Sequence, residues 1–124
     1  MAYIAQDLEH KLASNGHSMV GNGQCVSLVK AWAGAPPSST WRQGAKVLGN
    51  GMIQKGTIIA TFVDGVYPNW GHGNHAAIYL SSNGDSITVI DQWTGRSHHH
   101  PQERTIHTGG TSLSNDARAY SVVE

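Results

Sequence analysis

The sequence is poor in cysteine and in charged side chains. Cys25 is the single cysteine among 124 residues, so the chain cannot form an internal disulfide and is not a disulfide-stapled mini-domain. Only 13% of the residues are charged, eight basic against eight acidic, and no basic run occurs. This balance argues against electrostatic binding of nucleic acid or of an anionic membrane, and neither partner is expected.

Long apolar runs are also missing. Acidic and polar side chains interrupt the first residues, AYIAQDLEHKLASNG, where a secretory signal peptide needs an unbroken apolar stretch. No run elsewhere approaches membrane-spanning length. We therefore expect a chain that is made in the cytoplasm, does not insert into membranes and, if it acts elsewhere, leaves by a route other than the general secretory pathway. Its length predicts one domain, residues 1–124.

The first half of the chain has helical patterning. Apolar residues recur every four positions from Ile4 to Leu12, which predicts a short amphipathic helix over 4–14. A second helix is predicted over 24–34, because QCVSLVKAWAG has a broad apolar face that ends at a glycine and is followed by two prolines. A weaker pattern predicts a third short helix over 38–51.

Beyond Gly51 the pattern changes to that of strands. Five segments with strand-like patterning are predicted as strands, over 56–63, 74–82, 86–93, 104–108 and 117–123. The pair Asn83-Gly84 predicts a tight hairpin between the second and third of them, because Asn-Gly accepts the positive φ that such turns require. Helices followed by a meandering antiparallel sheet predict an α+β fold.

Three residues on these elements form a candidate catalytic site. Cys25 is predicted in the first turn of the second helix, where unpaired N–H groups and the helix dipole favour the thiolate and could receive an oxyanion. His75 begins one strand, and Asp91 lies on the strand that the hairpin places beside it. A base with an orienting carboxylate on the neighbouring strand is what a Cys-His-Asp triad requires. The alternatives are a buried structural cysteine, a surface histidine and a structural carboxylate.

Strand alternation places Asp91 on the same face as Ile87, Val89 and Trp93. Because these neighbours are large and apolar, we expect this face to pack against the helices. A carboxylate that faces the core needs a partner, and a histidine ring could supply one.

Three motifs, GQCVSLVKAW, GNHAAIYL and VIDQW, occur in an order that resembles the papain-like peptidoglycan amidases of the NlpC/P60 and CHAP group. The resemblance covers Gly21 to Trp93 and implies a cysteine that opens a helix packed on an antiparallel sheet. It implies that Cys25 is the nucleophile, His75 the base and Asp91 the orienting residue, with no cofactor. Cysteine precedes histidine here, unlike in the permuted lecithin:retinol acyltransferase type, which favours amide hydrolysis over lipid acyl transfer.

More narrowly, the segment NGQCVSLVKAWAGAPPSSTWRQGAKV resembles the small type VI secretion amidase effectors related to a Burkholderia NlpC/P60-like protein. This resemblance implies an antibacterial toxin that the type VI machinery delivers to the periplasm of a Gram-negative rival. The toxin would cut peptidoglycan stem peptides, at the D-alanine to meso-diaminopimelate cross-link or alternatively at the D-glutamate to diaminopimelate bond, and an immunity protein would block its site. A monomer is the simplest expectation. The alternatives are a cysteine hydrolase or deamidase of a protein substrate, and a non-enzymatic binding module.

Residues beside the proposed triad are candidates for substrate binding. Gln24 precedes the thiol, and Trp70 and Asn74 lie in YPNWGHGNH, an aromatic and glycine-rich loop that leads into the histidine strand. The alternatives are a helix-capping role for Gln24 and a packing role for Trp70 under its loop.

Three adjacent histidines, His98–His100, resemble a metal site at first sight. Consecutive residues of an extended loop point in alternate directions and cannot all ligate one ion well, so no metal site is predicted. We expect a solvated loop, with a surface zinc contact shared with His107 or His72 as the alternative.

Overall fold

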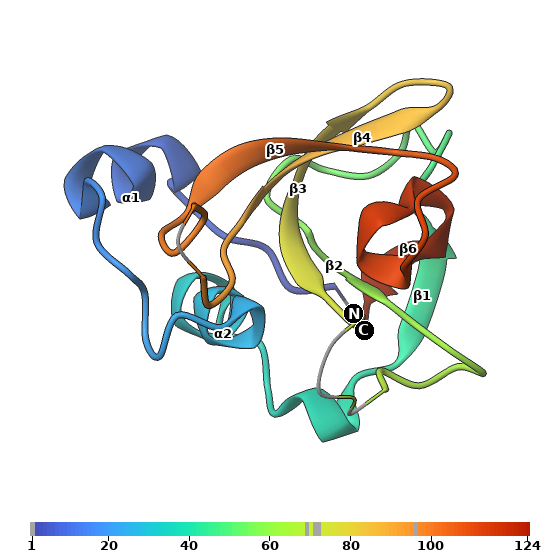
Figure 1. Cartoon of the computed structure of the whole chain (residues 1–124), viewed down its shortest axis with the longest axis horizontal. Coiled ribbons are helices and arrows are strands. Elements are labelled where there is room, and N and C mark those ends of the chain that lie inside the picture. Colours follow the sequence, from blue (N-terminus) through green and yellow to red (C-terminus); the bar gives the residue numbers. More distant parts are fainter. Residues whose placement is uncertain (1, 69, 71–72, 96) are drawn as a thin grey trace.

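The structure is a computed structural model that describes residues 2–68, 70, 73–95 and 97–124. In this part of the chain it has two α-helices and a six-stranded antiparallel sheet, which confirms the α+β class (Figure 1). The helices are α1 (Leu8–Asn15) and α2 (Cys25–Ala33). The strands are β1 (Gln43–Lys46), β2 (Ile58–Thr61), β3 (Ala76–Ser82), β4 (Ser86–Asp91), β5 (Gln102–His107) and β6 (Tyr120–Val123), and the short 3-10 turns are Ser38–Thr40, Leu113–Asn115 and Ala117–Ala119.

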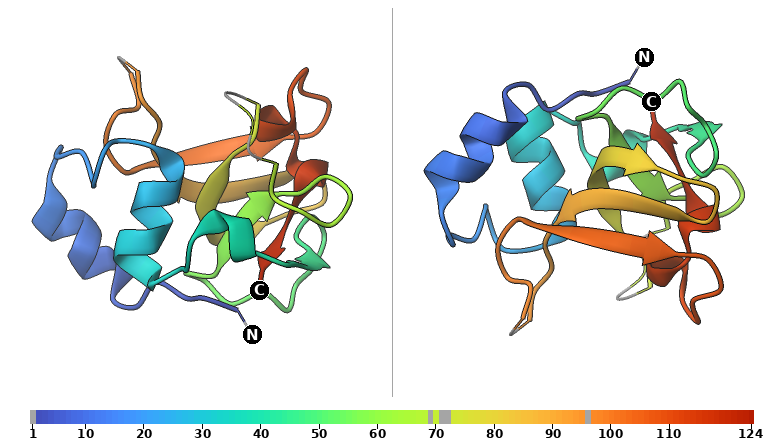
Figure 2. Two further views of the ribbon diagram at one scale, coloured as in Figure 1. Left: turned by 90° about the horizontal axis from the view of Figure 1, so that it is seen from below. Right: turned by 90° about the horizontal axis from the view of Figure 1, so that it is seen from above.

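The strands lie in the order β1-β6-β2-β3-β4-β5. Strands β2 to β5 are sequential neighbours, which confirms the predicted meander, and all pairs are antiparallel. The C-terminal strand β6 leaves this order and returns to lie between β2 and β1. Both chain ends therefore reach the same region of the molecule, as the views from three directions show (Figures 1 and 2).

Helix α2 forms where the sequence predicts it. Gln24 is extended, and the helix ends at Gly34, whose φ of 69° is left-handed and whose N–H donates to the carbonyl of Lys30. Leu28 and Val29 are fully buried against the sheet. The apolar face of this helix thus fixes the position of its first residue, Cys25, relative to the strands.

Helix α1 begins later than predicted. Ile4 forms an isolated bridge with Thr57, and the N–H of Ala5 donates to the carbonyl of Gly56. Asp7 then adopts a left-handed φ of 51° before the helix starts at Leu8. Pairing with the chain before β2 therefore competes successfully with helix formation over the first residues.

The predicted helix over 38–51 is wrong. Ser38–Thr40 forms a single 3-10 turn, and Gln43–Lys46 is the edge strand β1, paired with β6. Arg42 and Glu124 exchange backbone hydrogen bonds of 2.6 and 2.9 Å, next to this ladder. A partner about 80 positions away decides the structure here, which a local pattern does not reveal.

The hairpin between β3 and β4 forms as predicted, but by another turn geometry. Neither Asn83 nor Gly84 has a positive φ. Instead the Asn83 side-chain oxygen accepts bonds of 3.0 Å from the N–H groups of Asp85 and Ser86 and from the Ser86 hydroxyl. The asparagine side chain, rather than a left-handed backbone, closes this turn.

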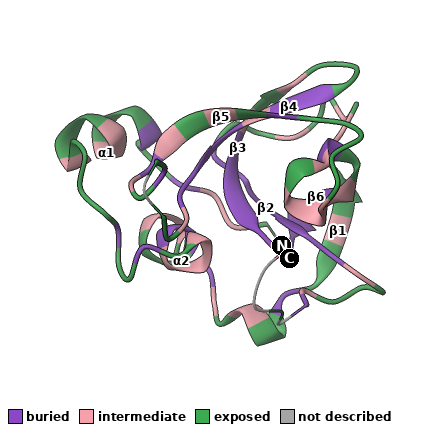
Figure 3. Cartoon of the chain, viewed as in Figure 1, coloured by how far each residue is buried: buried purple, intermediate pink, exposed green. Residues whose placement is uncertain are grey.

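Two apolar cores cover the two faces of the sheet. The first contains α2, with Leu28, and side chains such as Ile78 and Ile90. The second contains Ile87 and Val89 together with residues of the 47–53 and 117–120 segments. Both helices lie on one side of the sheet, and the central strands are buried while β1 and β5 are partly exposed (Figures 2 and 3).

The expectation that the face of Ile87, Val89 and Asp91 packs against the helices is therefore wrong. Ile87 and Val89 belong to the second core. Ile90, which points to the opposite face of β4, belongs to the core that contains α2. Ile87, Val89 and Asp91 do lie on one face of β4, as predicted. The pairing of β4 with β3 and with β5 places His75 and Arg104 on that face as well. The fully buried Asp91 thus ends β4 on the side away from the α2 core.

In the described part of the chain no helix has both the length and the hydropathy needed to cross a bilayer.

Candidate active site

Cys25 is the first residue of α2, and its side chain is partly buried. Gly23 immediately precedes this turn with a φ of 86°, and a Cβ placed there would lie 2.6 Å from Met19 Sδ. The left-handed φ favours glycine at this position, whereas the exposed Met19 side chain could move aside. Because the first N–H groups of a helix have no intrahelical acceptor, the thiol lies among donors that favour its anionic form.

His75 directly precedes β3 and is almost completely buried. Its N–H donates to Thr61 Oγ1 over 3.0 Å, which ties the residue to the end of β2. Its ring Nε2 lies 2.7 Å from Asp91 Oδ2 on the neighbouring strand β4. The ring lines the same cleft as the Cys25 thiol and lowers the pKa of that thiol. The structure thus brings together the three residues that the sequence singles out.

The pKa of the thiol is lowered and that of the imidazole is raised, and both shifts favour a thiolate–imidazolium ion pair. Burial raises the pKa of Cys25, but the hydrogen bond and charge of His75 and the N–H of Ala76 outweigh it, and the net pKa is lowered. Burial lowers the pKa of His75, but hydrogen bonds to Asp91 and Cys25 raise it to about 9. Both shifts favour transfer of the thiol proton to the imidazole.

Asp91 has two further cationic or hydrogen-bonding neighbours. Its Oδ1 lies 2.7 Å from His98 Nε2, and its Oδ2 accepts from Arg104 Nε over 2.9 Å. Burial raises the pKa of this carboxyl, but the hydrogen bonds and charges of His75 and Arg104 outweigh it and hold the pKa below its usual value. The carboxylate is ionised although it is fully buried.

The prediction of a solvated loop at His98–His100 is wrong for His98, which is buried against Asp91. The His98 ring also stacks on Trp93, with centroids 4.1 Å apart and planes 8° apart. Trp93 in addition packs beside the His75 ring at 6.0 Å and under the guanidinium of Arg104 at 5.1 Å. One indole therefore contacts all three basic groups that surround the carboxylate.

Gln92, between Asp91 and Trp93, anchors the segment that precedes the thiol. It is fully buried, its Oε1 accepts from the N–H of Val20 over 3.2 Å, and its Nε2 donates to the carbonyls of Val20 and Gln24 over 2.8 and 3.1 Å. This side chain fastens the turn before α2 to the end of β4. It therefore sets the distance between Cys25 and the His75–Asp91 pair.

Replacement of Gln92 by leucine is expected to lower the free energy of unfolding by about 1–3 kcal/mol, because buried backbone groups of Val20 lose their partners. Urea denaturation measures this change, and hydrogen exchange over residues 20–25 is expected to accelerate. Gln43→Leu is the matched control, because it removes a single side-chain bond, to Ser121, on the edge strand. Equal stability and equal exchange in the two variants would show that Gln92 does not anchor this turn.

A cleft of about 650 Å³ opens beside the thiol. Its walls contain Cys25, His75 and Arg104 and the three predicted substrate-binding residues, Gln24, Trp70 and Asn74. Trp70 is 50% exposed, so it is not packed under its loop. Gln24 is exposed beside the thiol and makes no side-chain cap to α2.

Tyr67 is a cleft residue that the sequence does not single out. Its hydroxyl lies 3.9 Å from Cys25 Sγ, and it lines the same cleft as Asn74. Burial, followed by the negative charge of Cys25, raises its pKa, so the hydroxyl keeps its proton and can donate it in a hydrogen bond. The signal was its place at the start of the same aromatic loop as Trp70.

No group of three or more histidine, cysteine, aspartate or glutamate side chains is arranged to hold a metal ion within the described ranges. His100 stacks on His17, with ring centroids 4.8 Å apart, so the histidines of this tract face different neighbours. His72, one partner of the alternative zinc contact, lies outside the described residues.

Comparisons with known proteins place the chain in a family. Residues 3–123 match the family model of domesticated amidase effector 2. A type VI secretion amidase effector 2 protein of Salmonella typhi is 42% identical over 117 residues, which cover 85% of this chain and 88% of the relative. A domesticated amidase effector 2 of Ixodes scapularis is 37% identical over 100 residues, 77% of this chain and 66% of the relative.

A solved structure supports the same assignment. A type 6 secretion amidase effector 2 (Tae2) superposes with a TM-score of 0.84 at 38% identity, covering 98% of this chain and 94% of that one. The family model and the solved structure both match nearly the whole chain. The protein therefore belongs to the type VI amidase effector family that comprises Tae2 and its domesticated relatives, Dae2.

Proposed function

We propose that this protein is a cysteine amidase that cleaves the peptide part of peptidoglycan and serves as an antibacterial type VI secretion effector. The observation that carries the proposal is the placement of Cys25 and His75 on the wall of one open cleft, with the His75 ring 2.7 Å from the buried Asp91 carboxylate. The family supports it, because its named members are amidase effectors.

In the proposed mechanism the Cys25 thiolate attacks the carbonyl carbon of the scissile amide. Asp91 accepts from His75 Nε2, which leaves Nδ1 of the ring to hold the proton taken from the thiol. His75 then delivers that proton to the leaving amine as the carbon–nitrogen bond breaks, and a thioester to Cys25 remains. Water, deprotonated by His75, attacks the thioester and releases the carboxylic acid product and the thiolate.

Two kinds of donor for the oxyanion lie near the sulfur. The first N–H groups of α2 have no intrahelical partner, and the Tyr67 hydroxyl keeps its proton 3.9 Å from Cys25 Sγ. Fixed donors of this kind stabilise the charge that develops in the tetrahedral intermediate. Gln24, Trp70 and Asn74 would contact the substrate along the same cleft.

The finer assignments follow the resemblance of the sequence to the NlpC/P60 group. They are a papain-like core, a stem-peptide substrate cut at the D-alanine to meso-diaminopimelate cross-link, and action in the periplasm of a Gram-negative target cell. The D-glutamate to diaminopimelate bond is the second candidate. A cognate immunity protein that covers the cleft would protect the producing cell.

Mass analysis of purified peptidoglycan after treatment with the protein tests the proposal. We expect cross-linked fragments to be replaced by pairs of pieces whose masses together exceed that of the parent fragment by one water, and the fragment masses identify the bond. The Cys25→Ser variant should release none of these pieces. Intact cross-links and intact stems after treatment with folded wild-type protein would contradict the proposal and favour a protein substrate or a binding role.

A further inference from the structure

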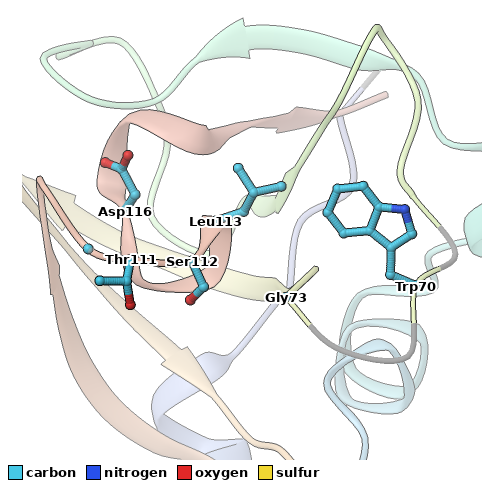
Figure 4. A pocket seen from close by; sticks show the side chains of 7 residues that line it. Trp70, Gly73, Thr111, Ser112, Leu113 and Asp116 are labelled. Atoms are coloured by element: carbon cyan, nitrogen blue, oxygen red, sulfur yellow. The ribbon is translucent and has the colours of Figure 1, made fainter.

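A second pocket adjoins the catalytic cleft at Trp70. It has a volume of about 370 Å³ and shares Trp70 and Gly73 with the cleft. Its remaining walls come from the segment after β5, with Thr111, Ser112 and Leu113 (Figure 4). The half-exposed indole of Trp70 therefore borders two adjoining pockets.

A single short turn separates the two pockets. In the turn Leu113–Asn115, Leu113 lines the second pocket, whereas Ser114 and Asn115 line the cleft. The turn is fixed to the catalytic side, because Arg104, which also bonds Asp91, donates to Asn115 Oδ1 over 3.1 Å. A ligand part in the second pocket would thus lie one turn away from the reacting groups.

The second pocket has fewer ionisable residues than the cleft. Among its described lining residues Asp116 is the only ionisable one, and both its carboxylate oxygens are engaged by Arg118 at 3.1 Å. In Figure 4 the Asp116 side chain points away from Trp70, while Leu113 extends toward the side on which the indole lies. The surface offered to a ligand consists of an aromatic ring, an aliphatic side chain and hydroxyl groups.

We propose that this pocket binds a neutral N-acetylated sugar of the glycan strand while the attached stem peptide occupies the cleft; this rests on the proposed peptidoglycan substrate. A pyranose ring has an apolar face that packs on an indole and a polar rim that hydrogen-bonds hydroxyl and backbone groups. Stem peptides carry carboxylates and amines, and among the described lining residues only Asp116, already paired with Arg118, is charged, so the pocket offers these groups no free charged partner. The volume is at the small end for ligand pockets, which suits one sugar residue.

The test compares a cross-linked stem peptide with the same peptide attached to its N-acetylated disaccharide. Wild-type protein is expected to cleave the sugar-bearing substrate with a kcat/KM about tenfold higher, the gain that a contact of ~1.4 kcal/mol produces. Thr111→Tyr, which fills the pocket without a cleft residue being changed, should remove this preference and leave cleavage of the bare peptide unchanged. Thr108→Tyr adds the same bulk to an exposed position outside both pockets and should retain the preference.

A binding measurement separates this inference from the proposed function. In Cys25→Ser protein, tri-N-acetylchitotriose is expected to shift the nuclear magnetic resonance signals of the Trp70 indole and of residues 110–113, and Thr111→Tyr should abolish these shifts. If the sugar binds in this way but the wild-type protein cleaves no peptidoglycan, the proposed sugar site is supported and the proposed amidase function is contradicted. Equal kcat/KM for the two substrates, or shifts produced by the bare peptide instead of the sugar, would overturn the sugar site and leave the amidase standing.

Discussion

Replacement of Cys25 by alanine is expected to lower kcat/KM for stem-peptide cleavage by at least about 10³-fold, because removal of a nucleophile eliminates the covalent route. Cys25→Ser is expected to be nearly as inactive, since the hydroxyl has no comparable anionic form beside His75. The rate of fragment release from purified peptidoglycan measures both. Toxicity of periplasm-directed protein should disappear in parallel.

The control for this experiment must separate chemistry from folding. Met52 is 91% exposed and does not line the cleft, so Met52→Ala should retain full activity and toxicity. Thermal unfolding of the Cys25 variants should remain close to that of the wild type, because the thiol is only partly buried. Undiminished toxicity of a folded Cys25→Ala protein would mean that the thiol does no chemistry.

Replacement of Asp91 by asparagine is expected to reduce kcat by up to about 10⁴-fold, the loss seen when the carboxylate of a serine-protease triad becomes an amide. The amide can donate to His75 Nε2, which selects the ring tautomer that cannot accept the thiol proton. The same change leaves Arg104 and His98 without the buried anion that both now contact. Breaking a buried pair in this way should lower the free energy of unfolding by about 3 kcal/mol.

Glu9→Gln is the matched control for Asp91→Asn. It also turns a paired carboxylate into an amide, but the Glu9–Lys55 pair lies on the surface, with side chains 85% and 54% exposed. Solvent screens such a pair, so neither stability nor activity should change measurably. If Asp91→Asn behaved like Glu9→Gln in both assays, the carboxylate would be neither a support for His75 nor a structural anchor.

The end of β4 explains why the site is compact. Asp91 bonds the imidazole, Gln92 fastens the turn before the nucleophile, and Trp93 packs on the basic groups around the carboxylate. Three consecutive residues thus hold three separate parts of the site. Alternation along the strand makes this possible, because neighbouring side chains point to opposite faces.

The sequence predicts the elements whose signals are local. Helix α2 is marked by its apolar face and terminal glycine, and the β3–β4 hairpin by Asn83-Gly84, even though the asparagine side chain closes the turn. The hairpin signal predicts that His75 and Asp91 lie on neighbouring strands, and the structure places them 2.7 Å apart. Together with the order of the three motifs, this local signal was enough to propose the candidate triad.

The remaining features depend on distant partners and carry no local signal. Strand β1 exists because β6 returns beside it, which overrides the helical pattern of its residues. His98 looks like part of a solvated histidine tract, yet Asp91 and Trp93 hold it in the interior. Gln92 could have been noticed as a polar residue that continues an apolar strand, but only the fold shows that it reaches Val20.

The most direct test of the central claim is the pH dependence of Cys25 alkylation by iodoacetamide, followed by mass spectrometry. The chain has one thiol, so the adduct reports this site alone. Because the pKa of Cys25 is lowered and that of His75 is raised to about 9, the wild-type rate should reach half its maximum below pH ~8.5, the value of a free thiol. In His75→Gln, burial acts unopposed by the imidazolium, and the midpoint should rise above ~8.5. A wild-type midpoint at or above that of a free thiol, unchanged in His75→Gln, would contradict the thiolate–imidazolium pair.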